Sequence, residues 1–358
     1  MPLEEKVGQL FIVPVDGAEA TFELIAEFGI GGVIYFGANL GDPTQIGELS
    51  NELQQAAAGA DRVGLLIALD QEGGRVQRLA PPFTVFPAAQ VFGRMNRPDL
   101  TERAAAVTAA ELRSVGINQV LAPVVDVLTQ ASTVIGDRSY GSDPDLVAGM
   151  TTASVAGFTA GGVLATAKHF PGHGATSVDS HAALPIIGST YPEWFNADRV
   201  PFRAAVAAGI PAVMVGHLAL PELDPTGMPA TLSEPIVGGI LRRGLRFDGL
   251  VMTDSLQMDG VRGSAADGEI AVLAIEAGAD LLLMPVDFHT ARQALLDAVA
   301  EGRLAEARID ESVERILQAK QWIGTLEPLL VDVAAIDGIV GAPAHRAVLD
   351  EVLDAAAP

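Results

Sequence analysis

The chain alternates between short apolar runs of strand length and longer amphipathic or alanine-rich segments. The runs are rich in Val, Ile and Leu, and they do not alternate strictly with polar residues. This pattern is typical of parallel strands that are covered on both faces. It predicts eight strands, within the ranges Gln9–Val15, Gly32–Phe36, Gly64–Leu69, Gln119–Val127, Val163–Ala167, Ala212–Leu218, Gly249–Thr253 and Asp280–Pro285.

The segments between these runs have helical length, and many begin after Pro, Ser or Asp or end at Gly, as helix caps prefer. A series of eight strand and helix units favours a single-domain (β/α)₈ barrel, the TIM-type α/β fold. An open, doubly wound sheet is the alternative, but the glycine-rich phosphate loop expected after its first strand is missing. The predicted helices are Pro43–Ala58, Asp99–Val115, Asp143–Thr159, Pro192–Ala208, Ser233–Leu245, Ala265–Ala277 and Ala307–Trp322.

Polar side chains repeatedly follow the apolar runs, where the strands would end. In barrels of this type the C-terminal ends of the strands carry the active site. The densest polar group is the loop Lys168–Pro185, which holds three of the chain's six histidines. We therefore expect one rim of the barrel to collect Asp16, Asn39, Asp70, Asp126, Lys168, His169, His217 and Asp254.

Composition excludes several classes of function. The absence of cysteine rules out disulfides and thiolate metal sites. A formal net charge of −23 disfavours nucleic acid or an anionic membrane as a partner. No apolar run reaches the length of a membrane span, and the N-terminus lacks the features of a signal peptide. As written, the chain is expected to be soluble and cytoplasmic, although a secretion or lipoprotein signal lost from the N-terminus would change that location.

Three residues in two places supply the elements of a double displacement. Asp254 directly follows a buried apolar run, where a carboxylate must be paired, hydrogen-bonded or used in chemistry. We interpret it as a nucleophile or base, with a helix N-cap as the alternative. Asp179 and His181 flank Ser180, and an imidazole held by a carboxylate can exchange a proton near neutral pH.

Two further segments combine acids with guanidinium groups. Asp70–Arg78 carries two of each, which suits a ligand with many hydroxyl groups, although a salt-bridged surface turn would have the same composition. Gly136–Gly141, which contains Arg138, is a weaker case of the same kind.

The loop at Lys168 also permits two other chemistries. A lysine at a strand end of a barrel is where a Schiff-base aldolase carries its nucleophile. The spacing of His169 and His173, with Asp179 and His181, is compatible with a metal hydrolase. However, Pro171 and Gly172 separate the first two histidines and prevent helical i, i+4 geometry, so we expect no metal.

The motifs in this chain resemble those of glycoside hydrolase family 3, and within it the NagZ-type β-N-acetylglucosaminidases. The resemblance runs from LEEKVGQLF at the N-terminus to about Gly324. It is carried by DQEGGRVQR from Asp70, GDRSYG from Gly136, KHFPGHG from Lys168 with the following DSH, and TDSLQM from Thr253.

This resemblance implies a retaining mechanism in which Asp254 attacks the anomeric carbon and forms a covalent glycosyl-enzyme intermediate. The dyad of His181 and Asp179 would act as acid and then as base, in place of the second carboxylate of most retaining glycosidases. No metal or organic cofactor is implied. The residues expected to bind the sugar are Asp70, Arg78, Arg138, Lys168 and His169, and we add His217.

The histidine of the DSH triplet favours the N-acetylhexosaminidase branch of the family, and the implied natural substrates are peptidoglycan fragments with a terminal β-linked GlcNAc. A phosphorylase is a rival, because some relatives with a histidine acid/base are reported to use phosphate instead of water. A broader β-glucosidase and a non-catalytic barrel that binds muropeptides are further alternatives.

Two departures from the family pattern affect the expected organisation. Ala175 stands where many relatives have Asp after the GHG triplet. We expect residues 1–325 to form the catalytic barrel and 326–358 to form a loop and helix extension, with the second domain of longer family members absent. The expected protein is a monomer that takes a small carbohydrate or muropeptide substrate.

Overall fold

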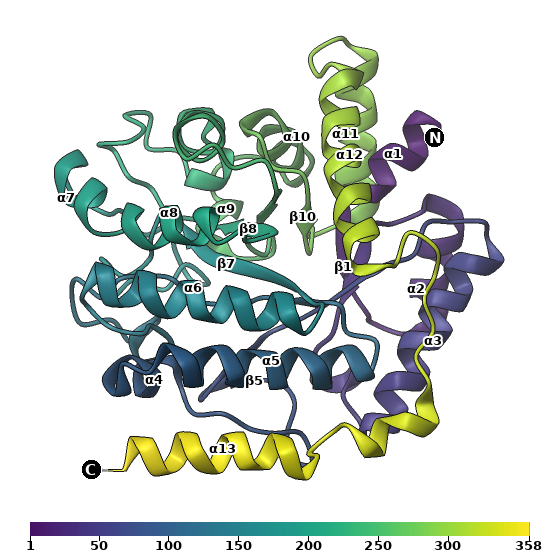
Figure 1. Ribbon diagram of the computed structural model, residues 1–358. Coiled ribbons are helices and arrows are strands. Elements are labelled where there is room, and N and C mark those ends of the chain that lie inside the picture. Colours follow the sequence, from purple (N-terminus) through teal and green to yellow (C-terminus); the bar gives the residue numbers. More distant parts are fainter. Residues whose placement is uncertain (358) are drawn as a thin grey trace.

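Eight parallel strands form a closed barrel with helices on the outside, as the computed structural model describes for residues 1–357 (Figure 1). The strand order is β10-β1-β2-β3-β6-β7-β8-β9. A parallel bridge between Met252 and Leu281 joins the two ends of this order and closes the ring. Each predicted run contains a strand, and these are β1 (Phe11–Pro14), β2 (Gly32–Ile34), β3 (Leu66–Leu69), β6 (Gln119–Val120), β7 (Leu164–Phe170), β8 (Ala212–Val215), β9 (Leu250–Thr253) and β10 (Leu282–Leu283).

The outer helices follow the strands in turn, so the prediction of a (β/α)₈ barrel is confirmed. Their apolar faces pack on the barrel wall, and one continuous core spans strands and helices. No helix within residues 1–357 is long and apolar enough to cross a membrane. The ring consists of α2 (Ala18–Glu23) with η1 (Leu24–Phe28), α3 (Pro43–Gly59), α5 (Pro98–Ser114), α6 (Pro144–Ala160), α8 (Arg199–Ala207), η5 (Pro235–Gly244), α10 (Asp267–Ala277), α11 (Phe288–Ala300) and α12 (Glu306–Ile323).

The single helix predicted over Pro192–Ala208 is wrong, because the chain breaks it into α7 (Tyr191–Asn196) and α8. A proline inside a helix removes a hydrogen bond and clashes with the preceding turn. Restarting the helix at Arg199 puts Pro201 in the first turn, where its missing N–H costs nothing. The break also turns the side chain of Asp198 inward, where it is buried.

Other differences lie near the C-terminal ends of the strands. Strand β7 extends to Phe170, so Lys168 and His169 belong to the strand and not to the loop after it. Strands β4 (Gln71–Gly73) and β5 (Val76–Gln77) form an antiparallel hairpin beyond β3 that the hydrophobic pattern did not predict. The hairpin folds the Asp70–Arg78 segment back over the barrel mouth.

The C-terminal segment lies along the outside of the barrel. Helix α13 (Pro343–Ala356) runs beside α5 and α4 (Ala89–Met95) (Figure 1), and Val348 and Val352 join the apolar cluster of those helices. The buried carboxylate of Glu111 on α5 accepts hydrogen bonds from the Gly341 N–H at 2.9 Å and from Nδ1 of His345 at 2.9 Å. A charged group therefore fixes the point where this segment meets the barrel.

Asp280, just before β10, is a buried charged centre on the outer side of the barrel wall. Its carboxylate pairs with Arg242 of η5, with Arg315 of α12 at 3.2 Å and with Arg308 at 3.7 Å. It also accepts the Val251 N–H at 2.9 Å, so a single anion connects strand β9 to two helices. Burial of an ion cluster is tolerable only while every charge has a partner.

We predict that Asp280→Ala lowers the free energy of unfolding by about 3–5 kcal/mol, because three guanidinium groups then share a buried site without an anion. Urea unfolding followed by circular dichroism measures the change. Asp248→Ala is the matched control, because Asp248 is exposed and makes no ion pair within residues 1–357. An equal loss in both variants would contradict the role given to Asp280.

Candidate active site

A cavity of about 390 Å³ opens at the C-terminal ends of the strands. Seven of the nine predicted site residues line it, whereas Asp179 and His217 do not. Asn39, also expected on this rim, bonds instead to the Val15 carbonyl and the Phe36 N–H of neighbouring loops. The predicted residues that line the cavity are Asp70, Arg78, Arg138, Lys168, His169, His181 and Asp254.

Lys168 lies at the centre of a buried charge network on one side of the cavity. Its ammonium is 2.8 Å from Asp70 Oδ1 and 2.7 Å from Glu72 Oε1. Burial disfavours the charged lysine, but the attraction of the two carboxylates outweighs it and raises the pKa of Lys168. The lysine therefore stays protonated and donates hydrogen bonds, which disfavours the Schiff-base aldolase.

Two arginines complete this network. Arg138 donates to both oxygens of Glu72 at 2.8 Å, in the planar two-point geometry that guanidinium forms with carboxylate. Arg78 approaches Asp70 at 3.4 Å and lies over the ring of Phe36. Burial raises the pKa values of Asp70 and Glu72, yet Lys168 and the arginines reverse the shift and hold both carboxyls below their usual range.

His169 is oriented by Asp126 beneath it. Nδ1 of His169 lies 2.8 Å from Asp126 Oδ2, and Nε2 faces Arg138 at 3.4 Å. The carboxylate of Asp126 is fully buried and also accepts the backbone N–H of His169 and of His173. Burial raises the pKa of Asp126, but the two histidines outweigh it and lower the pKa overall. The imidazole that faces the cavity thus has a fixed ring orientation.

Glu72 was not singled out from the sequence, and Asp126 was expected on the rim without a role in the site, although both belong to the site. The sequence carried a partial signal for each, because Glu72 is one of the two acids in the Asp70–Arg78 segment and Asp126 stands at the end of the fourth apolar run. Their roles depend on side-chain direction. In both cases the carboxylate reaches a side chain of another strand, Lys168 for Glu72 and His169 for Asp126, which no local pattern reveals.

Asp254 stands at the end of β9, partly buried in the cavity wall. Its Oδ1 accepts only the neighbouring Ser255 N–H, at 2.8 Å. The next helix, α9 (Asp259–Arg262), begins five residues on, so the helix N-cap interpretation of Asp254 is wrong. Burial raises the pKa of Asp254, but His169, His217 and Lys168 together lower it below its usual value. The carboxylate is therefore ionised and available for attack.

The pair of Asp179 and His181 lies on the loop after β7. His181 Nδ1 is 2.9 Å from Asp179 Oδ1, which also accepts the His181 N–H at 2.9 Å. The side chains are 71% and 50% exposed for His181 and Asp179, in contrast to the buried charges below. With Nδ1 held by the carboxylate, Nε2 is the ring nitrogen left to exchange a proton in the cavity.

His217 needs a correction, because it does not reach the cavity that the other residues line. It is fully buried, with Nδ1 at 2.7 Å from Thr231 Oγ1 and Nε2 at 2.8 Å from the Ser255 carbonyl. Both ring nitrogens therefore have protein partners. We assign His217 to the support of the Asp254 loop rather than to substrate binding.

The histidines of this loop do not converge in the manner of metal ligands. The rings of His169 and His173 meet edge to face with centroids 5.8 Å apart, and Nε2 of His173 faces Ser180 Oγ. Within residues 1–357 no group of three His, Asp or Glu side chains has an arrangement that would hold a metal ion.

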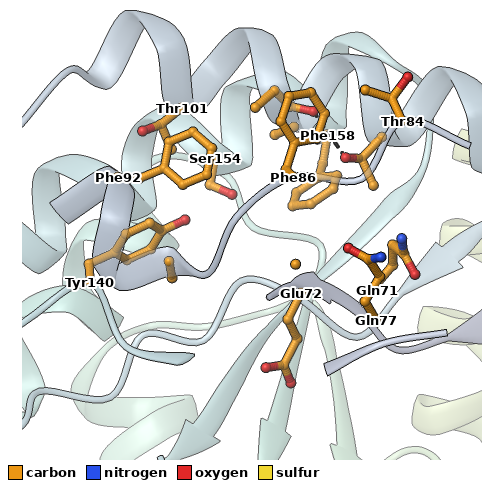
Figure 2. A pocket seen from close by; sticks show the side chains of 15 residues that line it. Gln71, Glu72, Gln77, Thr84, Phe86, Phe92, Thr101, Tyr140, Ser154 and Phe158 are labelled. Atoms are coloured by element: carbon orange, nitrogen blue, oxygen red, sulfur yellow. Dashed lines mark hydrogen bonds between the residues drawn. The ribbon is translucent and has the colours of Figure 1, made fainter. Parts of the chain in front are cut away.

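A second, much smaller cavity of about 50 Å³ lies behind the β4–β5 hairpin, against α5 and α6. Figure 2 shows Phe86, Phe92, Tyr140 and Phe158 around it, with the carboxylate of Glu72 turned away from them. The backbone of Glu72 therefore faces an aromatic layer while its charge faces the active-site cavity. This layer supports the hairpin that delivers Glu72.

Asp198 is a buried carboxyl group beneath the start of the loop that follows β7. Its Oδ1 has no hydrogen-bond partner, and it packs so closely on Gly172 that a Cβ there would lie 2.4 Å from Oδ1. Burial, together with the charge of Asp126, raises the pKa of Asp198 to about 7. The protein therefore holds this carboxyl protonated through the mildly acidic range.

Comparisons with known proteins find relatives over most of the chain. The profile of the glycosyl hydrolase family 3 N terminal domain matches residues 2–319. A Beta-hexosaminidase of Pseudomonas aeruginosa (strain LESB58) is 40% identical over 269 residues, which are 74% of this chain and 78% of the relative.

Two solved structures superpose on nearly the whole chain. A glycoside hydrolase family 3 beta-N-acetylglucosaminidase from Paenibacillus sp. str. FPU-7 gives a TM-score of 0.95 at 41% identity, covering 99% of this chain and 69% of that one. The Beta-glucoside phosphorylase BglX bound to 2FGlc gives 0.91 at 27% identity, covering 99% and 65%.

We predict that Asp198→Asn stabilises the protein more at pH 8.5 than at pH 5. Because its folded pKa lies above its unfolded value, Asp198 contributes stability at low pH that is lost as pH rises through about 7, whereas Asn does not titrate. Urea midpoints across this pH range measure the difference. Asp248→Asn, at an exposed position, should show a constant offset, and a constant offset for Asp198→Asn would contradict the prediction.

Proposed function

The chain belongs to glycosyl hydrolase family 3 and is a glycoside hydrolase, and from this premise we propose that it is a retaining exo-β-N-acetylglucosaminidase. The observation that carries the proposal is the placement of an ionised Asp254 and the His181 imidazole on the wall of one cavity. A nucleophile and a separate proton carrier are the minimum for double displacement. The names of the relatives favour an N-acetylhexosamine as the sugar that is removed.

The charge balance of the cavity supports a neutral sugar. Three carboxylates, Asp70, Glu72 and Asp254, face three permanent cations, and each cation is already paired within the site. A neutral ligand with many hydroxyl groups can accept and donate hydrogen bonds here without leaving a charge unpaired. We assign Asp70, Arg78, Arg138, Lys168 and His169 to the sugar hydroxyls and the acetamido group.

In the first step, Asp254 attacks the anomeric carbon and forms a glycosyl ester while the glycosidic bond breaks. The leaving oxygen takes the proton from Nε2 of His181. In the second step, His181 takes a proton from water, which attacks the same carbon and releases Asp254. Each step inverts the carbon, so the product keeps its configuration. Asp179 stabilises the imidazolium that donates the proton in the first step and forms again in the second, and it keeps Nε2 directed at the reaction.

We propose terminal GlcNAc of peptidoglycan fragments as the natural substrate, and a cytoplasmic monomer with residues 1–325 as the catalytic unit. The pairing of every cation in the cavity means that a negatively charged aglycone gains little attraction from these groups. Recognition of such a fragment would depend on its sugar end.

Phosphorolysis is the second candidate, and the superposition on a beta-glucoside phosphorylase favours keeping it. In that reaction phosphate, rather than water, attacks the glycosyl ester. A neutral imidazole repels an incoming anion less than a carboxylate would, so His181 is compatible with either acceptor. Hydrolysis releases the sugar with a free anomeric hydroxyl, whereas phosphorolysis releases the sugar 1-phosphate. Product analysis with and without phosphate therefore distinguishes the two reactions.

We predict that Asp254→Asn lowers kcat on 4-nitrophenyl N-acetyl-β-glucosaminide by roughly 10⁴-fold or more, because the amide cannot form the glycosyl ester. Release of nitrophenolate measures it. Asp259→Asn, at an exposed site five residues on, should retain normal activity. Undiminished turnover by Asp254→Asn would refute the nucleophile.

We predict that His181→Ala slows substrates with poor leaving groups by about 10²–10⁴-fold while slowing activated aryl glycosides less, because only the poor leaving groups need a proton. A series of aryl glycosides of graded leaving-group pKa measures the dependence. A uniform loss across the series would contradict the acid/base role.

A further inference from the structure

The middle residue of the Asp179–Ser180–His181 triplet is buried, although both of its neighbours are exposed. Ser180 is 2% exposed, and its Oγ lies 3.2 Å from Nε2 of His173. The side chain of Ser180 is therefore enclosed by protein, whereas the two dyad side chains are exposed and that of His181 lines the cavity. Among the side chains of the triplet, that of Ser180 is the one that hydrogen-bonds to His173, near the end of β7.

His173 is in turn fixed to the strand that binds the sugar. Its backbone N–H donates to Asp126 Oδ1 at 2.7 Å, and the other oxygen of that carboxylate holds Nδ1 of His169 at 2.8 Å. The His173 ring is buried, and its Nδ1 has no hydrogen-bond partner. Within the part of the chain that the structure describes, Ser180 is thus the one polar partner that orients this ring.

The backbone of the triplet is held from the opposite side by the loop of the nucleophile. The Ser180 carbonyl accepts the Gly260 N–H at 3.0 Å, and the His181 carbonyl accepts the Asp259 N–H at 3.3 Å. A Cβ at Gly260 would lie 2.6 Å from the Ser180 carbonyl oxygen, so the two backbones are in direct contact. Ser180 therefore connects the end of β7 with helix α9, which follows Asp254.

We propose that Ser180 and His173 are positioning residues that form a latch, defined as the contact of Ser180 Oγ with His173 Nε2, which holds the acid/base loop against the cavity. This inference rests on the proposed function, because it assigns the latch to the proton carrier of that reaction. Through Asp126 the latch also connects the dyad to His169, so the sugar-binding wall and the proton carrier share one buried anchor.

The latch matters because, apart from the two backbone hydrogen bonds from Asp259 and Gly260, it is what ties the dyad to the barrel. The side chain of His181 bonds only to Asp179 on the same loop, and such a local contact moves with the loop. General acid catalysis needs Nε2 within hydrogen-bond reach of the glycosidic oxygen, and displacement by about 1 Å can cost up to 10²-fold in rate. Ser180 and His173 also line the cavity, but this effect acts through the position of His181 and requires no contact of either residue with the substrate.

The test is a double-mutant cycle with Ser180→Ala and His181→Ala. We expect Ser180→Ala to lower kcat/KM by roughly 10- to 100-fold for a poor leaving group and by much less for 4-nitrophenyl. We expect the double variant to be no slower than His181→Ala alone, because the latch acts only through His181. Ser177→Ala, an exposed serine of the same loop, is the matched control and should leave the rates unchanged.

Two readouts separate this role from a loss of folding. Binding of the product GlcNAc, measured by calorimetry, should stay unchanged in Ser180→Ala, because the sugar-binding residues are intact. His173→Ala should reproduce the leaving-group dependence of Ser180→Ala, and combining the two should add nothing.

Several results would overturn the latch. Additive losses in the cycle, or a Ser180→Ala defect that is equal for good and poor leaving groups, would do so while leaving the acid/base assignment intact. If His181→Ala is itself indifferent to the leaving group, the proposed function of the dyad fails and the latch fails with it.

Discussion

The buried ammonium of Lys168 is the interaction on which the sugar-binding half of the site depends. It lies between Asp70 of the β3 end and Glu72 of the hairpin, and Glu72 in turn holds Arg138 from the loop after β6. Burying these charges costs several kcal/mol for each ion, and the cost is met only because each has a partner in place. Loss of Lys168 would remove the cation that Asp70 and Glu72 share. The network therefore fixes three loops in one arrangement before any ligand arrives, which is what electrostatic preorganisation requires.

The fold was predictable to the extent that it depends on periodicity. Parallel barrel strands are covered on both faces, so they read as unbroken runs of Val, Ile and Leu, and each of the eight runs contains a strand. The break between α7 and α8 was missed because the hydrophobic pattern continues across it. The break is set by Pro201, which is accommodated in the first turn of a new helix. The β4–β5 hairpin was missed because its strands are short and polar, and the aromatic side chains behind them come from other segments of the chain.

The site was predictable where chemistry is local and unpredictable where it depends on direction. Asp254 and Lys168 stand out because polar groups follow apolar runs, and the Asp179–His181 pair stands out because a carboxylate lies two residues from an imidazole. His217 carries the same signal, yet its ring turns toward Thr231 and away from the cavity. Glu72 contacts Lys168, which lies 96 positions further along the chain, and Asp126 contacts His169, which lies 43 positions further along. Contacts of that separation are set by the closure of the barrel and not by neighbouring residues.

The two halves of the site differ in burial, and the proposed reaction gives a reason for the difference. The sugar must stay in one place through both steps, because the glycosyl ester on Asp254 has to meet water at the same carbon. Buried ion pairs suit that task. The proton carrier faces a changing partner, first a bulky leaving group and then a water molecule, so its side chain has to remain accessible from solvent. An exposed dyad whose central serine is tied to the buried wall reconciles these needs, because Ser180 limits where His181 can be without enclosing it.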